Sequence, residues 1–224
     1  SCWAFTAIAA AEGSLLQQFG GDHTTLDMSE QYLLDVGTAG GCNGGFYIPA
    51  WEIMQAPNGG TATEADIPYM QSRRMPNPPL PFKVSSFGLV GGNYTPSDQQ
   101  IKEALLTYGP LAVTVDADEL FVAYGGGLFI GYPSDNSYVN HAVTLVGWDV
   151  DGWHIKNSWR ESWGEDGYMR IKYGTNNIGY AAAWVISANA SRGGRDPAQP
   201  RMLLNDADVQ SVEIWKRLAL YQAR

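Results

Sequence analysis

The sequence predicts an α+β protein built from two lobes, a helical first lobe and a β-rich second lobe. Helix signals dominate the first third of the 224 residues, and strand-like runs separated by glycine and aspartate dominate the part after Gly109. Between them, MPNPPLPF at 75–82 is rich in proline, which cannot continue a helix or a central strand. We therefore expect a helical lobe at 1–85, a β-rich lobe at 86–187, and a linker with a terminal helix at 188–224.

Three helices are predicted in the first lobe. The stretch at 3–19, WAFTAIAAAEGSLLQQF, contains good helix formers with apolar residues on nearly every side, so it indicates a mostly buried helix that ends at the glycines after it. Ser29 is a suitable N-cap for a second helix in MSEQYLLDV, because its hydroxyl can accept a first-turn N–H. YIPAWEIMQ at 47–55 predicts the third.

The second lobe begins with one amphipathic helix, SDQQIKEALLTYG, and continues with strands. The strand-like runs are PLAVTVDA, HAVTLVGWDV, WHIKNSW and GYMRIKYG, all rich in β-branched and aromatic residues and bounded by turn residues. In the tail, ANASRGGRDPAQP at 188–200 has the composition of a linker. NDADVQSVEIWKRLALYQAR at 205–224 is acidic at its start and basic at its end, as the helix dipole prefers.

Composition and charge argue against several classes of function. The chain carries 14 Lys and Arg against 23 Asp and Glu, a net charge of -9, and it has no basic run that could neutralise phosphates. No apolar stretch approaches the roughly 20 residues that cross a bilayer. Two cysteines and three scattered histidines have neither a disulfide framework nor metal-ligand spacing. We expect no nucleic-acid or membrane partner, no metal and no cofactor.

Cys2 has a position that can activate a thiol. It lies at the N-terminal end of the first predicted helix, where a thiolate, which is far more nucleophilic than a thiol, is stabilised, above all beside a cationic imidazole. His141 opens a predicted strand and Asn157 ends the next one. Two adjacent strands could therefore present an imidazole and an amide side by side, and the amide would orient the ring.

The chain resembles the papain-like cysteine peptidases over residues 1–187. The resemblance depends on seven segments in the order of the family, which are SCWAF, SEQYLLD, GCNGG, TEADIPY, NHAVTLVGW, KNSW and WGEDGYMRI. His141 and Asn157 follow Cys2 by 139 and 155 residues, close to the spacing of about 130–150 residues in the family. The resemblance implies a papain-like two-lobed fold, with a helical lobe, a β-barrel-like lobe and the active site in the cleft between them.

Catalytic roles follow from the resemblance motif by motif. Cys2 would attack the scissile carbonyl, His141 would form the ion pair and later protonate the leaving amine, and Asn157 would hold the imidazole. Trp159 in KNSW would shield the His–Asn hydrogen bond from water. These roles imply a cysteine peptidase that acts through a thioester acyl-enzyme on polypeptide substrates, with a propeptide or protein inhibitor as a possible partner. We expect an endopeptidase by default, because the sequence shows no extra loop that would block an end of the cleft.

The resemblance also implies that the chain starts inside a family motif. The glutamine that would help to bind the oxyanion, and the cysteine that would pair with Cys42, both fall before Ser1. We therefore expect an N-terminally truncated chain in which Cys42 has no disulfide partner. The alternative for Cys42 is a small buried hydrophobic residue. Arg160 departs from the pattern, because the family usually has glycine after KNSW.

Substrate-binding residues are likewise implied by position. Gly44 and Gly45 lack side chains, so an extended peptide could approach their backbone, although a turn with positive φ explains them too. An uncharged pocket for the second residue before the cleaved bond would prefer bulky apolar or aromatic side chains. Its expected lining is Phe46, Ile48, Pro49, Thr114, Val139, Ala142 and Ile186, and Asn140 and Trp159 complete the substrate-binding set.

Two other classes of function stay open on the sequence. One is a peptidase-like binding or regulatory protein that has lost turnover, and the other is an N-terminal-nucleophile amidohydrolase, which is disfavoured because Cys2 is the second residue. His154 has no motif around it, so we expect a surface or satisfied core residue. The acidic balance is compatible with an extracellular or an acidic, lysosome-like compartment.

Overall fold

The computed structural model describes residues 1–20, 26–72, 77–189 and 193–194. The chain forms two compact units, one made of Ser1–Gly88 with a returning segment that starts at Trp184, and one made of Leu89–Ala183. The terminal helix expected at 205–224 lies outside the described residues. The lobe boundary expected near Ser85 stays a prediction. In the described part, no helix combines the length and apolar character that crossing a membrane requires.

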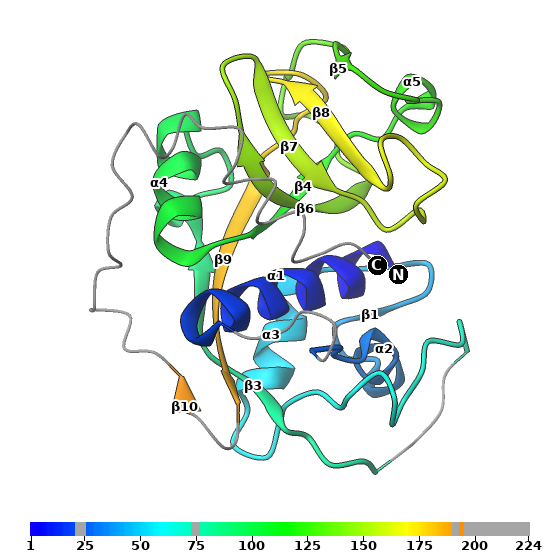
Figure 1. Cartoon of the computed structure of the whole chain (residues 1–224), viewed down its shortest axis with the longest axis vertical. Helices are drawn as coiled ribbons and strands as arrows, with labels where there is room; N and C mark the ends of the chain where they lie inside the picture. Colours follow the sequence, from blue (N-terminus) through cyan, green and yellow to red (C-terminus); the bar gives the residue numbers. More distant parts are fainter. Residues whose placement is uncertain (21–25, 73–76, 190–192, 195–224) are drawn as a thin grey trace. The chain divides into compact units, whose positions relative to one another are not determined.

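The first unit contains three helices among its described residues. They are α1 (Cys2–Phe19), α2 (Glu30–Val36) and α3 (Tyr47–Gln55), and Figure 1 shows α3 next to α1. The N-cap expected for α2 is present, because the Ser29 side chain accepts a hydrogen bond from the N–H of Tyr32. Trp51 of α3 is fully buried and its indole N–H donates to the carbonyl of Ala7 in α1 at 3.1 Å.

Helix α1 is the buried centre of this unit. Small residues such as Ala4, Ala7 and Ala11 are fully buried along it, which lets neighbouring segments approach its backbone closely. Ser187 ties it to the returning segment: its hydroxyl donates to Ala11 O at 2.8 Å and its N–H donates to Ser14 Oγ at 3.1 Å. The helix that begins at Cys2 is therefore held rigidly by its surroundings.

Short strands complete the first unit. β1 (Gly40–Gly41) and β2 (Gly44–Gly45) form an antiparallel pair. β3 (Phe82–Leu89) pairs with β9 (Tyr180–Asn189), and β10 (Gly193–Gly194) pairs antiparallel with the end of β9. β9 contributes Tyr180–Ala183 to the second unit and its later residues to the first.

The second unit is a sheet with the strand order β9-β4-β6-β7-β8-β5. The strands are β4 (Leu111–Val115), β5 (Leu128–Phe129), β6 (His141–Trp148), β7 (Gly152–Lys156) and β8 (Tyr168–Lys172). Neighbours are antiparallel except β5 and β8, which are parallel. His141 pairs with Val115 at the end of the β4–β6 ladder, so the ladder fixes the position of the His141 backbone.

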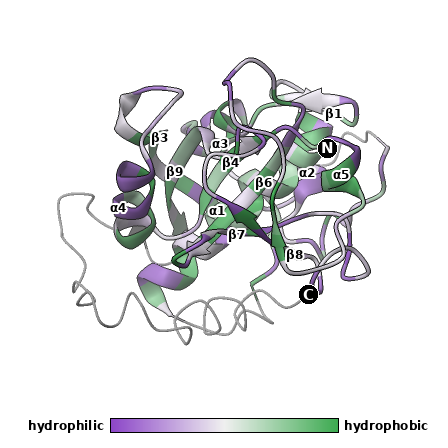
Figure 2. Ribbon diagram, turned by 90° about the horizontal axis from the view of Figure 1, so that it is seen from above, coloured by the Kyte–Doolittle hydropathy of each residue, from purple (hydrophilic) through white to green (hydrophobic). Residues whose placement is uncertain are grey.

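Helices and core positions agree with the sequence pattern in this unit. α4 (Asp98–Tyr108) begins at Ser97 with a capping box to Gln100, and Figure 2 shows hydrophilic and hydrophobic residues side by side along it. Its apolar residues Ile101 and Leu105 are buried. The unit also contains the 3-10 turn η1 (Val90–Gly92) and the one-turn helix α5 (Glu119–Val122).

Candidate active site

Cys2 is the first residue of α1, and it is half-buried. The first turn of α1 contains no acidic side chain, so nothing on the helix opposes the partial positive charge of its N-terminus. Trp3, the next residue, is fully buried and anchors the helix end. The Cys2 side chain therefore lies at the positive end of the helix dipole.

Two of the sequence motifs support the start of α1. Tyr69, at the end of TEADIPY, hydrogen-bonds through its hydroxyl to Ser1 Oγ at 2.8 Å and meets the ring of Phe5 edge-on at 4.9 Å between centroids. Gln31 of SEQYLLD is buried, and its side chain accepts from Met70 N at 2.9 Å and donates to Ser72 O at 2.7 Å. The segment that carries Tyr69 is thereby fixed to α2.

The glycine hairpin of GCNGG packs against the residue that follows Cys2. The Trp3 indole N–H donates to Gly41 O at 3.0 Å. A Cβ at Gly45 would lie 2.6 Å from the Trp3 ring, so glycine is required there by packing. Gly44 has φ 156 and open space around its Cβ position, so its requirement is conformational. The exposed backbone of this hairpin lies close to the N-terminal end of α1.

His141 and Asn157 meet in the second unit. His141 is the first residue of β6, Asn157 directly follows β7, and His141 Nε2 lies 2.8 Å from Asn157 Oδ1. The N–H of Ser158 also donates to Oδ1 at 2.8 Å, which settles the orientation of the amide. Because an amide oxygen only accepts, Nε2 carries the hydrogen. Nδ1 is then the ring atom that can gain and lose the transferable proton.

Aromatic rings cover this pair. Trp159 stacks on His141 with centroids 4.6 Å apart and an interplanar angle of 28°. Phe121 is fully buried beneath them and contacts His141, Trp159 and Trp163 at centroid distances of 6.4, 5.8 and 5.5 Å. Rings in these arrangements exclude water from the hydrogen bond between His141 and Asn157.

One polar atom of the pair is left unsatisfied. Asn157 Nδ2 is buried, and it has no hydrogen-bond acceptor among the described residues. A buried donor without a partner costs about 1–3 kcal/mol. A core that had only to be stable would not need an amide here, so its presence fits a role in orienting the imidazole.

Arg160, immediately after Trp159, has a strained backbone. Its φ is 71, in the left-handed region that costs residues other than glycine about 1–2 kcal/mol. The turn is held by the N–H of Trp163, which donates to Arg160 O at 3.2 Å, and by the N–H of Asn157, which donates to Gly167 O at 2.9 Å. The same hydrogen-bonded loop thus fixes both Asn157 and Arg160.

The expected substrate-binding residues divide between the two units. The first unit contains Gly44, Gly45, Phe46, Ile48, Pro49 and Ile186. The second contains Thr114, Val139, Asn140, Ala142 and Trp159, of which Thr114 and Ala142 are directly opposite each other in the β4–β6 ladder. Asn140 also has a local structural role, because its Oδ1 accepts from Ala117 N at 2.7 Å.

Cys42 is an exposed thiol in the glycine hairpin, and neither Cys42 nor Cys2 forms a disulfide among the described residues. The Cys42 Sγ lies 3.6 Å from the carbonyl oxygen of Gln71. The alternative of a small buried hydrophobic residue is therefore wrong, because the tight turn of β1 and β2 directs this position to the surface. The two cysteines of the chain thus have different environments.

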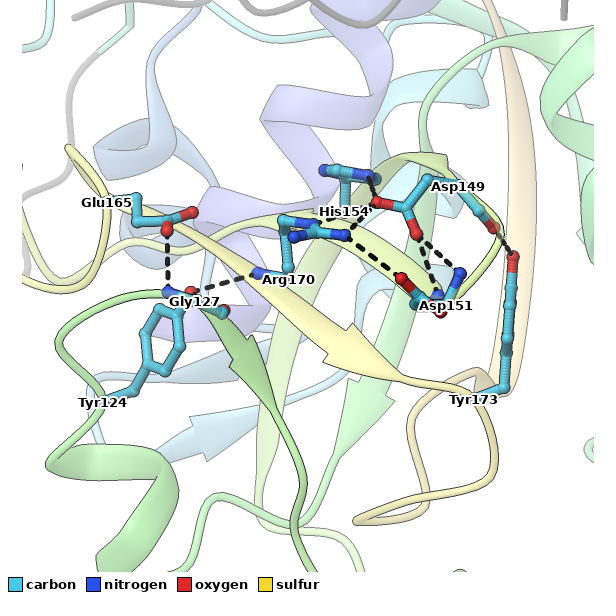
Figure 3. Close-up of polar contacts among 9 residues, drawn as sticks. Tyr124, Gly127, Asp149, Asp151, His154, Glu165, Arg170 and Tyr173 are labelled. Atoms are coloured by element: carbon cyan, nitrogen blue, oxygen red, sulfur yellow. Dashed lines mark hydrogen bonds and ion pairs between the residues drawn. The ribbon is translucent and has the colours of Figure 1, made fainter. Parts of the chain in front are cut away.

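His154 is a buried, satisfied residue away from the His141 pair. Figure 3 shows its side chain directed at Asp149, with Nε2 3.0 Å from Oδ2 of the carboxylate. Arg170 donates to the same oxygen from Nε at 2.9 Å and from NH2 at 2.6 Å, and the hydroxyl of Tyr173 donates to the Asp149 carbonyl at 2.6 Å. This network joins the turn between β6 and β7, where Asp149 lies, to Arg170 of β8.

Folding lowers the pKa values of both His154 and Asp149 in this network. Burial lowers the pKa of His154 below its ordinary value, although the carboxylate of Asp149 opposes this. Burial alone would raise the pKa of Asp149, but hydrogen bonds from Asp151 N–H and Arg170 hold it below its usual range. With both values lowered by folding, the unfolded chain binds more protons than the folded chain in acid, so acid destabilises the fold.

We therefore expect His154→Gln to reduce the acid sensitivity of folding. The amide keeps a donor for Asp149 but does not titrate, so the loss of unfolding free energy between about pH 7 and about pH 5, the range where an unfolded histidine gains its proton, should be smaller than in the wild type. Urea unfolding at several pH values measures this. Parallel curves of unfolding free energy against pH for the two proteins would contradict it.

Sequence reasoning missed the aromatic support of His141 from α5. That helix has only the four residues Glu119–Val122, too few to show a helical period. A local signal was present: Asp118 caps the helix by accepting from Phe121 N at 2.8 Å, and its other oxygen accepts from Asn176 Nδ2 at 2.9 Å.

Metal-ligating clusters of His, Cys, Asp and Glu are absent from the described residues.

Comparisons with known proteins agree with this geometry. A family model described as papain family cysteine protease matches residues 1–188. The chain is 37% identical over 183 residues to zingipain-2 of Zingiber officinale, with 79% of this chain and 80% of zingipain-2 covered. It is 38% identical over 189 residues to viral cathepsin of Heliothis zea nuclear polyhedrosis virus, with 80% of this chain and 48% of that protein covered. The chain thus spans about half of that relative, and 50% of fruit bromelain of Ananas comosus.

Solved structures show the same fold. Bromelain from Ananas comosus in complex with the E64 inhibitor matches with a TM-score of 0.69 and 29% identity, covering 82% of this chain and 87% of bromelain. Procathepsin L2 from Tenebrio molitor matches with a TM-score of 0.72 and 31% identity, covering 83% and 61%. The predicted papain-like α+β fold is confirmed. The chain belongs to the papain family of cysteine proteases.

Proposed function

We propose that this protein hydrolyses peptide bonds with Cys2 as nucleophile, His141 as general acid and base, and Asn157 as the residue that orients the imidazole. The observation that carries the proposal is the 2.8 Å hydrogen bond from His141 Nε2 to Asn157 Oδ1 under the Trp159 ring. It holds a histidine in one tautomer with Nδ1 available. The position of Cys2 at the start of α1 supports the other half of the ion pair.

In the proposed reaction, the Cys2 thiolate attacks the scissile carbonyl carbon and a C–S bond forms. The imidazolium of His141 transfers its Nδ1 proton to the leaving amine as the C–N bond breaks, which leaves a thioester. The neutral ring then takes a proton from water, the hydroxide attacks the thioester, and the carboxylic acid departs as the thiolate and imidazolium reform. The backbone N–H of Cys2 would bind the oxyanion, a contribution of about 10²- to 10³-fold in rate per donor.

The proposed substrates are polypeptides with a bulky apolar or aromatic residue at the second position before the cleaved bond. The expected lining is uncharged, and Thr114 has its hydroxyl engaged with Tyr180 O at 2.8 Å, so it presents little free polarity. A propeptide or protein inhibitor is the proposed partner; solved relatives include a procathepsin and an E64 complex. We propose an extracellular or acidic, lysosome-like compartment.

The two cysteines provide a direct test of the ion pair within one molecule. At about pH 5, where an ordinary thiol is almost entirely protonated, we expect iodoacetamide to label Cys2 at least about 10-fold faster than exposed Cys42, because a thiolate is the reacting species. Peptide mapping by mass spectrometry measures both rates. His141→Ala should remove the difference, whereas Cys42→Ser should leave the Cys2 rate unchanged.

Two results of this experiment would count against the proposal. Equal labelling of Cys2 and Cys42 in the wild type would mean that no ion pair forms. Fast labelling of Cys2 that survives His141→Ala would mean that the helix alone activates the thiol. Fast, His141-dependent labelling without any peptide cleavage would instead support a peptidase-like binding protein.

A further inference from the structure

We propose that Arg160 binds a carboxylate on the part of the substrate that leaves as the amine. The inference rests on the proposed peptidase function and names a specificity-determining residue for it. The carboxylate belongs either to an Asp or Glu side chain in the first two residues after the cleaved bond, or to the C-terminus of a short leaving segment. Both sources present the same planar group to the guanidinium.

Position is the first argument. In the proposed reaction His141 gives its proton to the leaving amine, so the leaving segment must pass next to the imidazole. Trp159 stacks on that imidazole at 4.6 Å, and Arg160 is the next residue, with its Cα about 3.8 Å from that of Trp159. A cation therefore borders the surface over which the leaving segment passes.

The availability of the side chain is the second argument. Arg160 is exposed, and the ion pairs among the described residues involve His154, Arg170, Asp149 and Asp151 rather than Arg160. Nearby Glu165 is engaged with the N–H of Gly127 at 2.8 Å. A guanidinium group that is not paired with a carboxylate of the protein is suited to bind a carboxylate of a ligand.

The backbone is the third argument. At φ 71, glycine or asparagine would fit this turn with less strain than arginine. Nothing in the packing requires the guanidinium, because the hydrogen bonds that hold the turn come from the backbone of Arg160, Trp163, Gly167 and Asn157. Strain retained beside a reactive group is a pointer to function.

The test compares blocked peptides that share one acyl side. In one set of peptides, Asp, Gln or Lys is the first or the second residue after the cleaved bond. A further pair of peptides ends two residues after the cleaved bond, one with a free C-terminal carboxylate and the other with an amidated C-terminus. For wild type and Arg160→Lys we expect one of the two carboxylate sources to give a higher kcat/KM than its neutral partner. The ratio should be about 1.5-fold to fivefold, the size of one exposed ion pair. In Arg160→Gln the ratio should fall to about one, and in wild type it should fall with added salt.

Glu161→Gln is the matched control, because it changes one exposed charge at the adjacent position. It should leave the cleavage of the neutral peptides unchanged and keep the preference for carboxylate. An equal ratio in wild type and Arg160→Gln would overturn the role of Arg160 and leave the peptidase proposal standing. If no peptide of the series is cleaved, the proposed function fails, and this inference fails with it. Melting temperatures of the variants verify that each is folded.

Discussion

Cys2→Ala is expected to lose peptide cleavage by about 10⁴-fold or more, because residues of a nucleophile–base unit each carry nearly the whole effect of the unit. The assay is hydrolysis of a fluorogenic dipeptide amide. Leucine or phenylalanine is the second residue before the cleaved bond. Cys2 is the first residue of the buried helix α1, and the proposal assigns the nucleophilic sulfur to it alone. Alanine is also the better helix former there, so the loss should not come from unfolding.

The control for this variant is Cys42→Ala, which removes the other cysteine from an exposed position. It should keep the activity of the wild type within about twofold, since exposed substitutions of this kind change stability by less than about 0.5 kcal/mol. Cleavage at the wild-type rate by Cys2→Ala would exclude Cys2 as the nucleophile and with it the proposed mechanism.

His141→Ala is the second large effect that we expect, a loss of about 10³-fold or more in kcat. The variant removes the ring whose Nε2–H donates to Asn157 Oδ1 at 2.8 Å and which stacks on Trp159. Without it, the leaving amine has no proton donor and the thiol loses its counterion. Activity as a function of pH, measured alongside kcat and KM, separates this chemical loss from weaker binding.

His154→Gln is the matched control for His141→Ala, because it removes the other histidine of the same unit. His154 hydrogen-bonds to Asp149, whereas the catalytic proposal uses the hydrogen bond between His141 and Asn157. Replacement of His154 should therefore leave kcat unchanged. The double variant Cys2→Ala with His141→Ala should be no less active than Cys2→Ala alone. A further fall in activity on combining them would show that His141 acts independently of the thiol.

Several elements were predictable from local pattern because their reasons are local. The N-cap predicted at Ser29 is present, and the helix predicted at 47–55 has those bounds. The structure adds an N-cap at Ser97 for the helix predicted in SDQQIKEALLTYG. The caps satisfy first-turn N–H groups through neighbours within three residues. Spatial information from elsewhere in the chain was not needed for these helices.

Strand β9 shows where local pattern fails. It begins with Tyr180 followed by three alanines, and alanine has the highest intrinsic helix propensity. Ala183 nevertheless pairs with Ala112 of β4, and β9 also pairs with β3. Helix propensity amounts to less than about 1 kcal/mol per residue, so ladder hydrogen bonds and burial from distant segments override it.

The order of the motifs alone determined the family, the helix with Cys2 at its start, and the residues that carry the chemistry in the proposal. Tertiary structure decided what surrounds those residues: the Phe121 ring under His141, the Asp149 partner of His154, and the left-handed backbone of Arg160. The physical reason is the range of the interactions. A helix cap or a helical period depends on a few neighbouring residues, whereas a ring contact or a carboxylate partner depends on which distant segments the fold brings together.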